Sequence, residues 1–528
     1  TYQGTEDPAL LSLMVGSRSA TDLATAFDNS KSSNVRSAAM RRYLGDLNYT
    51  IGFRLSPAAG HPIVVGPLTT GDTTPVQNLY TLVFNNAFLS PSAQTTTLLG
   101  QYNGASPAAQ PELLTRLNRS VLQDAFTELR RVYDDNIAYK HLAAGDGFAI
   151  MANGIEVYTF GFSDHTADRN DVLWHNALLD ANIAGPTMTV REGQTFHLDL
   201  SNVSMKMRPD LFDPHTVHFH GFPQAAPIFD GMPMASIGVR EGATQRYYYL
   251  LNDPGTYFYH CHVEATEHMQ QGMIGNLWVY PKQDRTNVGT SFPKLPYRDV
   301  ANSQQIGSGK HQSGFHYAYN DLDGSTYYDK ELPLQMTGFD HHFHDEELAI
   351  QPPDFFHLFD DMPLLNGRGY PDTVKSSMPV PQSVIDSLDP QETPTSAGFA
   401  VPGSKQRVAS TFFGSDLPKV GDYILLRISN VSETDFNTLT VLGLPMRVVG
   451  KDARLLRGPS TASNPIGQDL SYNTTSVTLG GGESIDVILD TRTAEAGKKY
   501  FIYATRFTQL SNDHEDYGGI MTHIEFAP

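Results

Sequence analysis

Apolar residues recur at two different periods along the chain. Between residues 113 and 132 they fall at three- and four-residue steps, which predicts an amphipathic helix, and Pro111 suits its first turn. A second helix is expected over residues 8–27. No chemistry-bearing cluster accompanies either pattern. Residues 1–150 are therefore predicted to form a partly helical N-terminal module that packs on, caps or oligomerises the remainder.

From about residue 155 the pattern changes to short segments in which apolar and polar residues alternate between turn residues. In the first part of this region, strands are expected at 156–162, at 188–200 as two strands joined by a turn, and at 246–251, 256–260 and 275–280. Short strands at this spacing are typical of a β-sandwich. Residues 151–283 are predicted to form one.

Similar segments return after a stretch rich in Gly, Ser and Asp at residues 302–325. The expected strands lie at 332–336, 423–429, 438–442, 446–449, 476–479, 484–490 and 500–504, and loops fill residues 351–409. We therefore predict a linker over 284–330 and a second sandwich over 331–528. The fold class is mainly β: two sandwiches after the helical module.

Composition narrows the possible partners. The net charge of −20 argues against binding nucleic acid or an anionic membrane surface. No apolar run is long enough to span a bilayer, and one cysteine excludes an intramolecular disulfide framework. The chain starts at Thr1 without a signal-like apolar segment, so we expect a mature or trimmed chain.

The chain's single cysteine lies within its densest group of histidines. A thiolate, two imidazoles and a weak axial thioether are the ligands of a blue-copper centre, and four residues supply this set: His215, Cys261, His268 and Met273. Four more histidines in the same stretch remain: His218, His220, His260 and His262. A structural zinc site is a poor alternative, because such sites close with four ligands that usually include several cysteines.

These motifs resemble the multicopper oxidases and related cupredoxins, a group that includes laccases and copper nitrite reductases. The resemblance is strong over residues 155–283 and weak over 330–528. It rests on residues 184–193, the pattern His215-x-x-His218-x-His220-Gly221, and residues 229–233, 255–262 and 365–371. It implies that both sandwiches are cupredoxin-like Greek-key domains.

The resemblance also implies a role for each ligand. His215, Cys261, His268 and Met273 would bind a type 1 copper. His218 would bind a type 2 copper, and His220, His260 and His262 would bind a type 3 pair. Electrons from a reductant would pass from the type 1 copper through Cys261 and its flanking histidines to a cluster that reduces dioxygen to water.

Three departures from the family pattern matter. First, six residues separate Cys261 from His268, whereas the family's loop is usually shorter. Glu264 and Glu267 lie in this enlarged loop, where they could relay protons or bind substrate. We predict a catalytic role for Glu264; the alternative is that both are solvated loop residues.

Second, the family's cluster needs two facing sets of four histidines, and this chain shows one. The second sandwich has Ile502-Tyr503-Ala504 where a His-x-His strand would be needed, and residues 1–150 contain no such motif. A homo-oligomer is therefore expected, with another subunit completing the cluster across a twofold axis.

Third, the copper cysteine lies in the first sandwich, as in nitrite reductases and some two-domain oxidases. A nitrite reductase remains the alternative enzyme, although His218 stands where that resemblance expects an aspartate and His262 is an extra ligand. The other alternative is an electron-transfer protein that uses the type 1 copper alone.

A second histidine-rich run covers residues 340–347. On a strand, His342 and His344 would share one face and could bind a metal together with His341. The alternative is an exposed, polar strand end.

The sequence thus predicts a laccase-like copper oxidase that is secreted, periplasmic or on the cell surface. Its expected partners are dioxygen and a small reductant. Phenolic or aromatic compounds are the first choice of reductant, and metal ions such as Mn(II), Fe(II) or Cu(I) are the near competitor.

Overall fold

The computed structural model describes residues 92–109, positions 112, 113, 116, 117 and 120, and residues 136–168, 170–299, 304–349, 352–387, 406–513 and 515–528. The chain divides into two compact units, Thr1–Ala138 and Tyr139–Pro528. In the described residues, no helix is long and apolar enough to cross a membrane.

The first unit is described mainly around one helix, α5 (Ala93–Gly104). The Ser92 hydroxyl caps it by accepting a hydrogen bond from the backbone N–H of Thr95. Leu98 packs against Leu117, and both are buried. The helix expected over residues 8–27, and most of the one over 113–132, lie outside the described residues.

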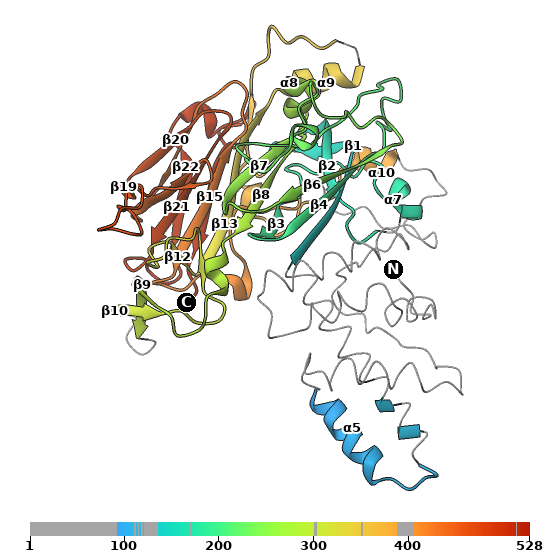
Figure 1. Cartoon of the computed structure of the whole chain (residues 1–528). Helices are drawn as coiled ribbons and strands as arrows, with labels where there is room; N and C mark the ends of the chain where they lie inside the picture. Colours follow the sequence, from blue (N-terminus) through green and yellow to red (C-terminus); the bar gives the residue numbers. More distant parts are fainter. Residues whose placement is uncertain are drawn as a thin grey trace. The chain divides into compact units, whose positions relative to one another are not determined.

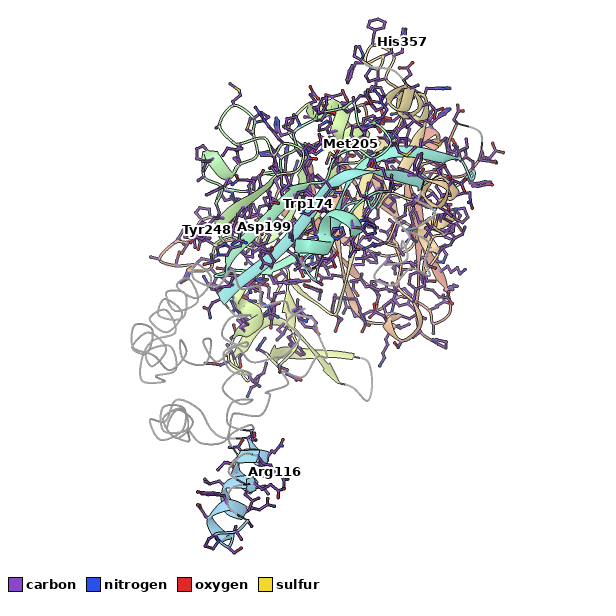
Figure 2. The ribbon with its side chains drawn as sticks, turned by 90° about the vertical axis from the view of Figure 1, so that its right-hand side faces the viewer. Arg116, Trp174, Asp199, Met205, Tyr248 and His357 are labelled. Carbon is purple, nitrogen blue, oxygen red and sulfur yellow. The ribbon has the colours of Figure 1, made fainter. Side chains whose placement is uncertain are left out.

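Two four-stranded sheets form the first sandwich (Figure 1). One has the order β2-β1-β4-β6 and the other β3-β8-β7-β5. The strands are β1 (Ile137–Ile150), β2 (Glu156–Asp164), β3 (Met188–Arg191), β4 (Thr195–Asn202), β5 (His218–Phe219), β6 (Thr244–Leu250), β7 (Gly255–His260) and β8 (Ile274–Tyr280). Figure 2 shows Asp199 and Tyr248 on the neighbouring strands β4 and β6. Strand β1 lies at the end of residues 1–150, which were predicted to form the helical module, and the sequence pattern did not indicate it.

The second sandwich pairs a larger sheet, β14-β13-β15-β21-β17-β18 with β19 beside β17, with the sheet β20-β16-β22-β23. Its strands are β13 (Lys330–Phe339), β14 (Met362–Leu365), β15 (Tyr423–Asn430), β16 (Asn437–Val441), β17 (Met446–Lys451), β18 (Arg454–Leu455), β19 (Tyr472–Thr474), β20 (Ser476–Leu479), β21 (Glu483–Asp490), β22 (Lys499–Ala504) and β23 (Met521–Glu525). Apolar residues from both sheets, including Ile428, Val487 and Ile502, form one buried core. Burying each such side chain stabilises the fold by about 1.5–3 kcal/mol.

The remaining elements are short. Four strands follow the first sandwich and precede the second along the sequence, and they form two hairpins: β9 (Ser291–Asp299) with β10 (Gln304–Lys310), and β11 (His316–Tyr317) with β12 (Tyr327–Tyr328). The helices are α7 (Asn170–Asn176), α8 (Ala265–Gln270), α9 (His341–Ala349) and α10 (Gln382–Asp386). The predicted mainly β class is confirmed.

A buried arginine joins the two sandwiches. Arg427 on β15 is 1% exposed and donates to the carboxylate of Glu331 (2.7 Å) and to the hydroxyl of Thr256 on β7 (2.9 Å). Thr256 in turn donates to Asp486 on β21 (2.6 Å), and the Arg427 guanidinium lies 5.0 Å from the ring of Trp278 on β8. The second sandwich is thereby fixed to the strand that leads to His260.

Replacing Arg427 by Met should lower the free energy of unfolding by about 3–5 kcal/mol, because it leaves buried carboxylates unpaired. The matched control is Arg492→Met. Arg492 is exposed, and its ion pair with Asp490 lies at the surface, so its loss should cost at most about 1 kcal/mol. Urea unfolding of both variants measures the difference, and equal shifts in the two midpoints would contradict the assigned role.

Candidate metal centre

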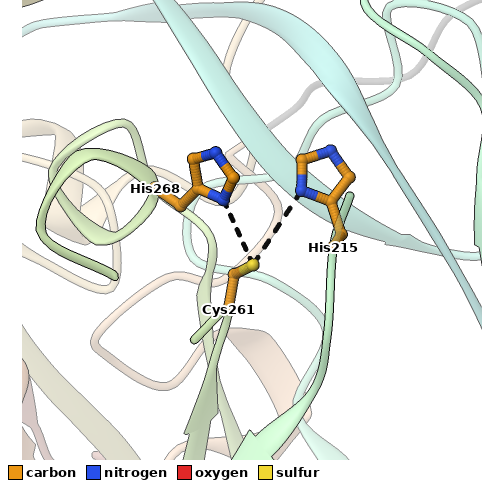
Figure 3. A group of neighbouring side chains, drawn as sticks. All are labelled: His215, Cys261 and His268. Carbon is orange, nitrogen blue, oxygen red and sulfur yellow. Dashed lines mark hydrogen bonds between the residues drawn. The ribbon is translucent and has the colours of Figure 1, made fainter. Parts of the chain in front are cut away.

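The predicted type 1 ligands meet at one buried point. Cys261 follows β7 directly, His268 lies on α8, and His215 precedes β5, where it exchanges two backbone hydrogen bonds with Val239. The Cys261 Sγ lies 3.2 Å from Nδ1 of His268 and 3.9 Å from Nδ1 of His215. Figure 3 shows both rings turned toward the sulfur. We call His215, Cys261 and His268 the thiolate triad.

The protonation states of the triad suit a metal. All three side chains are buried, and burial lowers the pKa of His268 to about 3 and that of His215 well below its usual value. Both imidazoles are therefore neutral at ordinary pH, as ligation requires. Burial raises the pKa of the Cys261 thiol to about 11, so a bound cation would have to stabilise the thiolate. Two imidazole nitrogens and one sulfur fit copper.

Met273 is buried beside the triad. Its carbonyl accepts from the backbone N–H of Cys261 (3.1 Å), and its own N–H donates to the carbonyl of His268 (2.8 Å). These two bonds hold the ends of the enlarged loop together. The axial role of Met273 stays a prediction.

The four remaining histidines gather on the other side of the same segment, and we call them the histidine cluster. The His218 ring centroid lies 5.6 Å from that of His220, 5.3 Å from that of His260 and 5.1 Å from that of His262. One ring nitrogen from each of His218, His220 and His260 lies within 4.8 Å of the others. The structure thus brings together the side chains that the sequence assigned to types 2 and 3.

Hydrogen bonds orient the rings of the cluster. The Nδ1–H of His218 donates to the carbonyl of Asp230 (2.6 Å), and that of His260 donates to the carbonyl of Cys261 (2.7 Å). In both rings the unprotonated Nε2 therefore remains available to bind a metal. Burial and the neighbouring imidazoles lower the pKa of His260 to about 3, so its ring is neutral.

The second sandwich closes one side of the cluster. The His220 ring stacks on Phe258 with centroids 4.6 Å apart and hydrogen-bonds to the backbone of Gly482, which precedes β21. A Cβ atom on Gly482 would lie 3.0 Å from Cε1 of His220, and the φ of Gly482 is +95°. Only glycine fits there without strain. No motif singled out Gly482, so this contact was not predicted from the sequence.

The carboxylate of Glu264 lies at the thiolate triad and not at the histidine cluster. Its side chain is 58% exposed, and its Oε2 lies 3.9 Å from Nε2 of His268. Glu267 and Asp213 lie close to Glu264 and to a ring nitrogen of His268. Sequence reasoning did not single out Asp213, although it stands two residues before His215.

The histidine-rich run at residues 340–347 was predicted to be a strand, and this prediction is wrong. Asp340 caps helix α9 by accepting from the backbone N–H groups of His342 and Phe343, so the chain turns helical there. His342 and His344 consequently do not share a face. His344 is buried between the carbonyls of Tyr158 and Gln270, whereas His341 pairs with Asp361 (2.6 Å) and His342 is exposed.

The second sandwich also holds a cavity of about 170 Å³. Asp360, Asp361, Asp435 and Arg506 are among its lining residues, and none of the predicted ligands is. The cavity is therefore separate from both groups of ligands.

Known proteins match the part of the chain that holds the predicted copper ligands. The family model for multicopper oxidases matches residues 165–284. A copper-containing nitrite reductase of Neisseria meningitidis is 32% identical over 114 residues, which are 21% of this chain and 27% of the relative. A laccase of Aspergillus fumigatus is 23% identical over 247 residues, 45% of this chain and 37% of the relative.

The chain thus spans well under half the length of these relatives. Among solved structures, a blue copper oxidase from Nitrosomonas europaea aligns with a TM-score of 0.46 and 19% identity, covering 74% of this chain and 86% of the other. Residues 165–284 thus match the multicopper oxidase family model, and they hold all eight predicted copper ligands.

Proposed function

We propose that the chain is a laccase-like copper oxidase that acts outside the cytoplasm. It takes single electrons from a small reductant at the thiolate triad and reduces dioxygen to water at the histidine cluster. One observation carries the proposal: Cys261 faces His215 and His268, while its neighbours His260 and His262 face His218. Two different ligand groups are thus joined by single peptide units.

The protein's own residues hold the candidate ligand atoms in a fixed orientation. Copper, when bound, supplies one-electron redox chemistry at the triad and dioxygen reduction at the cluster. The chain keeps the imidazoles neutral by burial, directs Nε2 of His218 and His260 through hydrogen bonds to carbonyls, and keeps the sulfur out of water. The short link from Cys261 to the flanking histidines is an electron path along bonded atoms.

The same proposal includes a second subunit. In the described part of the chain, no second group of histidines faces the cluster, and strand β22 contains no histidine. His218, His220 and His262 are partly exposed, so another protein chain can reach them. A second copy, related by a twofold axis, would complete the cluster with its own four histidines.

A copper nitrite reductase is the second candidate, favoured by the matches to the Neisseria enzymes. It differs in needing a single type 2 ion, for which three histidines suffice. The fourth histidine, His262, lies with its ring centroid 5.4 Å from that of His260 and favours the oxidase. A third possibility is electron transfer at the triad alone. Oxygen uptake with a phenolic dye supports the oxidase, and anaerobic nitrite consumption supports the reductase.

Two variants should separate the roles of the ligand groups. Cys261→Ser should abolish the intense visible copper–thiolate band and, with it, oxygen uptake. His262→Ala should keep that band but lower oxygen uptake by more than the roughly 10–100-fold that an outer-shell partner costs. His357→Ala is the matched control, because His357 is exposed, pairs with Asp354 and lies at the edge of the molecule in Figure 2. Loss of the visible band in His262→Ala would contradict the separation of the two groups.

Copper content and native mass test the shared cluster. The purified protein should be a dimer or larger, contain more than one copper per chain, and give an EPR signal distinct from that of the type 1 ion. Removal of copper by a chelator should abolish both signals and the oxygen uptake. A monomer with one copper per chain and no second signal would exclude the shared cluster and leave electron transfer as the function.

A further inference from the structure

Helix α8, which carries His268, contacts both sandwiches. On the side of the first sandwich, the Phe160 ring of β2 meets the His268 ring edge to face, with centroids 5.7 Å apart. Thr266 and Gln270 are four residues apart on α8 and therefore share one face of the helix. His268 stands two residues from each of them, about 200° around the helix axis. One face of α8 thus serves the thiolate triad, and the opposite face carries Thr266 and Gln270.

The Gln270 side chain is fixed at both of its polar atoms by residues of the second sandwich. It is 2% exposed, its Oε1 accepts from the backbone N–H of Asp340 (2.8 Å), and its Nε2 donates to Oδ1 of Asp360 (2.9 Å). A donor on one side and an acceptor on the other allow only one orientation of the amide. The backbone carbonyl of Gln270 also lies 3.0 Å from Nε2 of His344. The end of α8 is therefore bonded to three residues of the second sandwich.

The carboxylate of Asp360 is itself held in place. Its Oδ2 accepts from the hydroxyls of Ser432 (3.0 Å) and Thr434 (2.6 Å), which belong to the loop after β15. Together with the amide of Gln270, three donors meet this carboxylate. Asp360 consequently presents a fixed acceptor to Gln270, because its other oxygen is tied to the loop.

A second hydrogen bond joins the same face of α8 to the same loop. Glu433 hydrogen-bonds to the side chain of Thr266. Burial, and then the neighbouring Asp360 carboxylate, raise the pKa of Glu433 to about 9, so this contact adds no second charge beside Asp360 at ordinary pH. Thr266 and Gln270 lie on either side of His268 along the helix. A rotation of α8 that moved His268 away from the thiolate triad would therefore break both contacts.

We propose that Gln270 is a positioning residue through which the second sandwich sets the geometry of the thiolate triad. Its bonds to Asp340 and Asp360 keep Nδ1 of His268 at the sulfur of Cys261 in the metal-free protein, and they hold the ring in that direction when copper is bound. This inference rests on the proposed function only in taking the triad as a copper site.

Reversing one hydrogen bond tests this role. Gln270→Glu replaces the donor that faces Asp360 by a carboxylate, while the bond from the N–H of Asp340 remains possible. The double variant Gln270→Glu/Asp360→Asn restores one donor and one acceptor in the opposite direction and has the same total charge as the wild type. Gln382→Glu is the matched control, because Gln382 on α10 also donates its amide to an aspartate, Asp386 (2.8 Å), but is exposed.

Two measurements report on the triad, and neither requires turnover. In the copper-free protein, Gln270→Glu should raise the rate of Cys261 alkylation by at least about tenfold, because losing a hydrogen bond to a carboxylate favours local opening of α8. In the copper-loaded protein, the same variant should shift the visible copper–thiolate band and the EPR hyperfine splitting. The double variant should be alkylated within about threefold of the wild-type rate and recover the wild-type spectra. Gln382→Glu should match the wild type in both measurements.

Wild-type alkylation and spectra in Gln270→Glu would overturn the proposal, even if the variant unfolds at lower urea, because that result describes a merely structural role. A double variant no closer to the wild type than Gln270→Glu would also overturn it. Should Gln270→Glu alone fail to fold, the double variant decides: wild-type spectra support the proposal, and altered spectra or a failure to fold contradict it.

Failure of the oxidase function would give a different result. A protein that binds type 1 copper but takes up no oxygen is not an oxidase. The positioning role of Gln270 is still decided, because oxygen uptake enters neither measurement.

Discussion

The alternation of side chains along an extended backbone is the constraint on which the site depends. Successive residues of an extended strand point to opposite sides. Strand β7 and its continuation therefore direct His260 and His262 to one side and Cys261 to the other. The same rule places His218 and His220 on one face of the neighbouring segment. A shift by one residue would exchange the two ligand groups, so the register of β7 with β5 and β8 determines the chemistry.

The second sandwich stabilises this register without contributing a predicted ligand. Arg427 bonds to Thr256 near the start of β7, and the backbone of Gly482 contacts the His220 ring near its end. Strand β7 is therefore supported along its length by a neighbouring domain. The second domain thus supports the strand, and His218, His220 and His262 stay partly exposed.

The grouping of the candidate ligands was predictable from the sequence, because one cysteine and its flanking histidines allow few arrangements. Most strands of both sandwiches followed from alternation, but β1, β14 and β23 did not. The sequence could not reveal contacts between residues that are distant along the chain, such as those of Arg427 with Thr256 and of Gly482 with His220. It also misassigned the run around His342, because a local cap by Asp340 outweighed the strand pattern. Asp213 was missed because its significance depends on a loop folding back over His268.

Anomalous diffraction at the copper edge is the most direct test of the central claim, that one segment holds two different copper sites. The account predicts one peak between Cys261, His215 and His268, and further peaks against Nε2 of His218 and His260 that are also bound by residues of a second chain. A single peak at Cys261, with the histidine cluster empty in a fully loaded crystal, would contradict it.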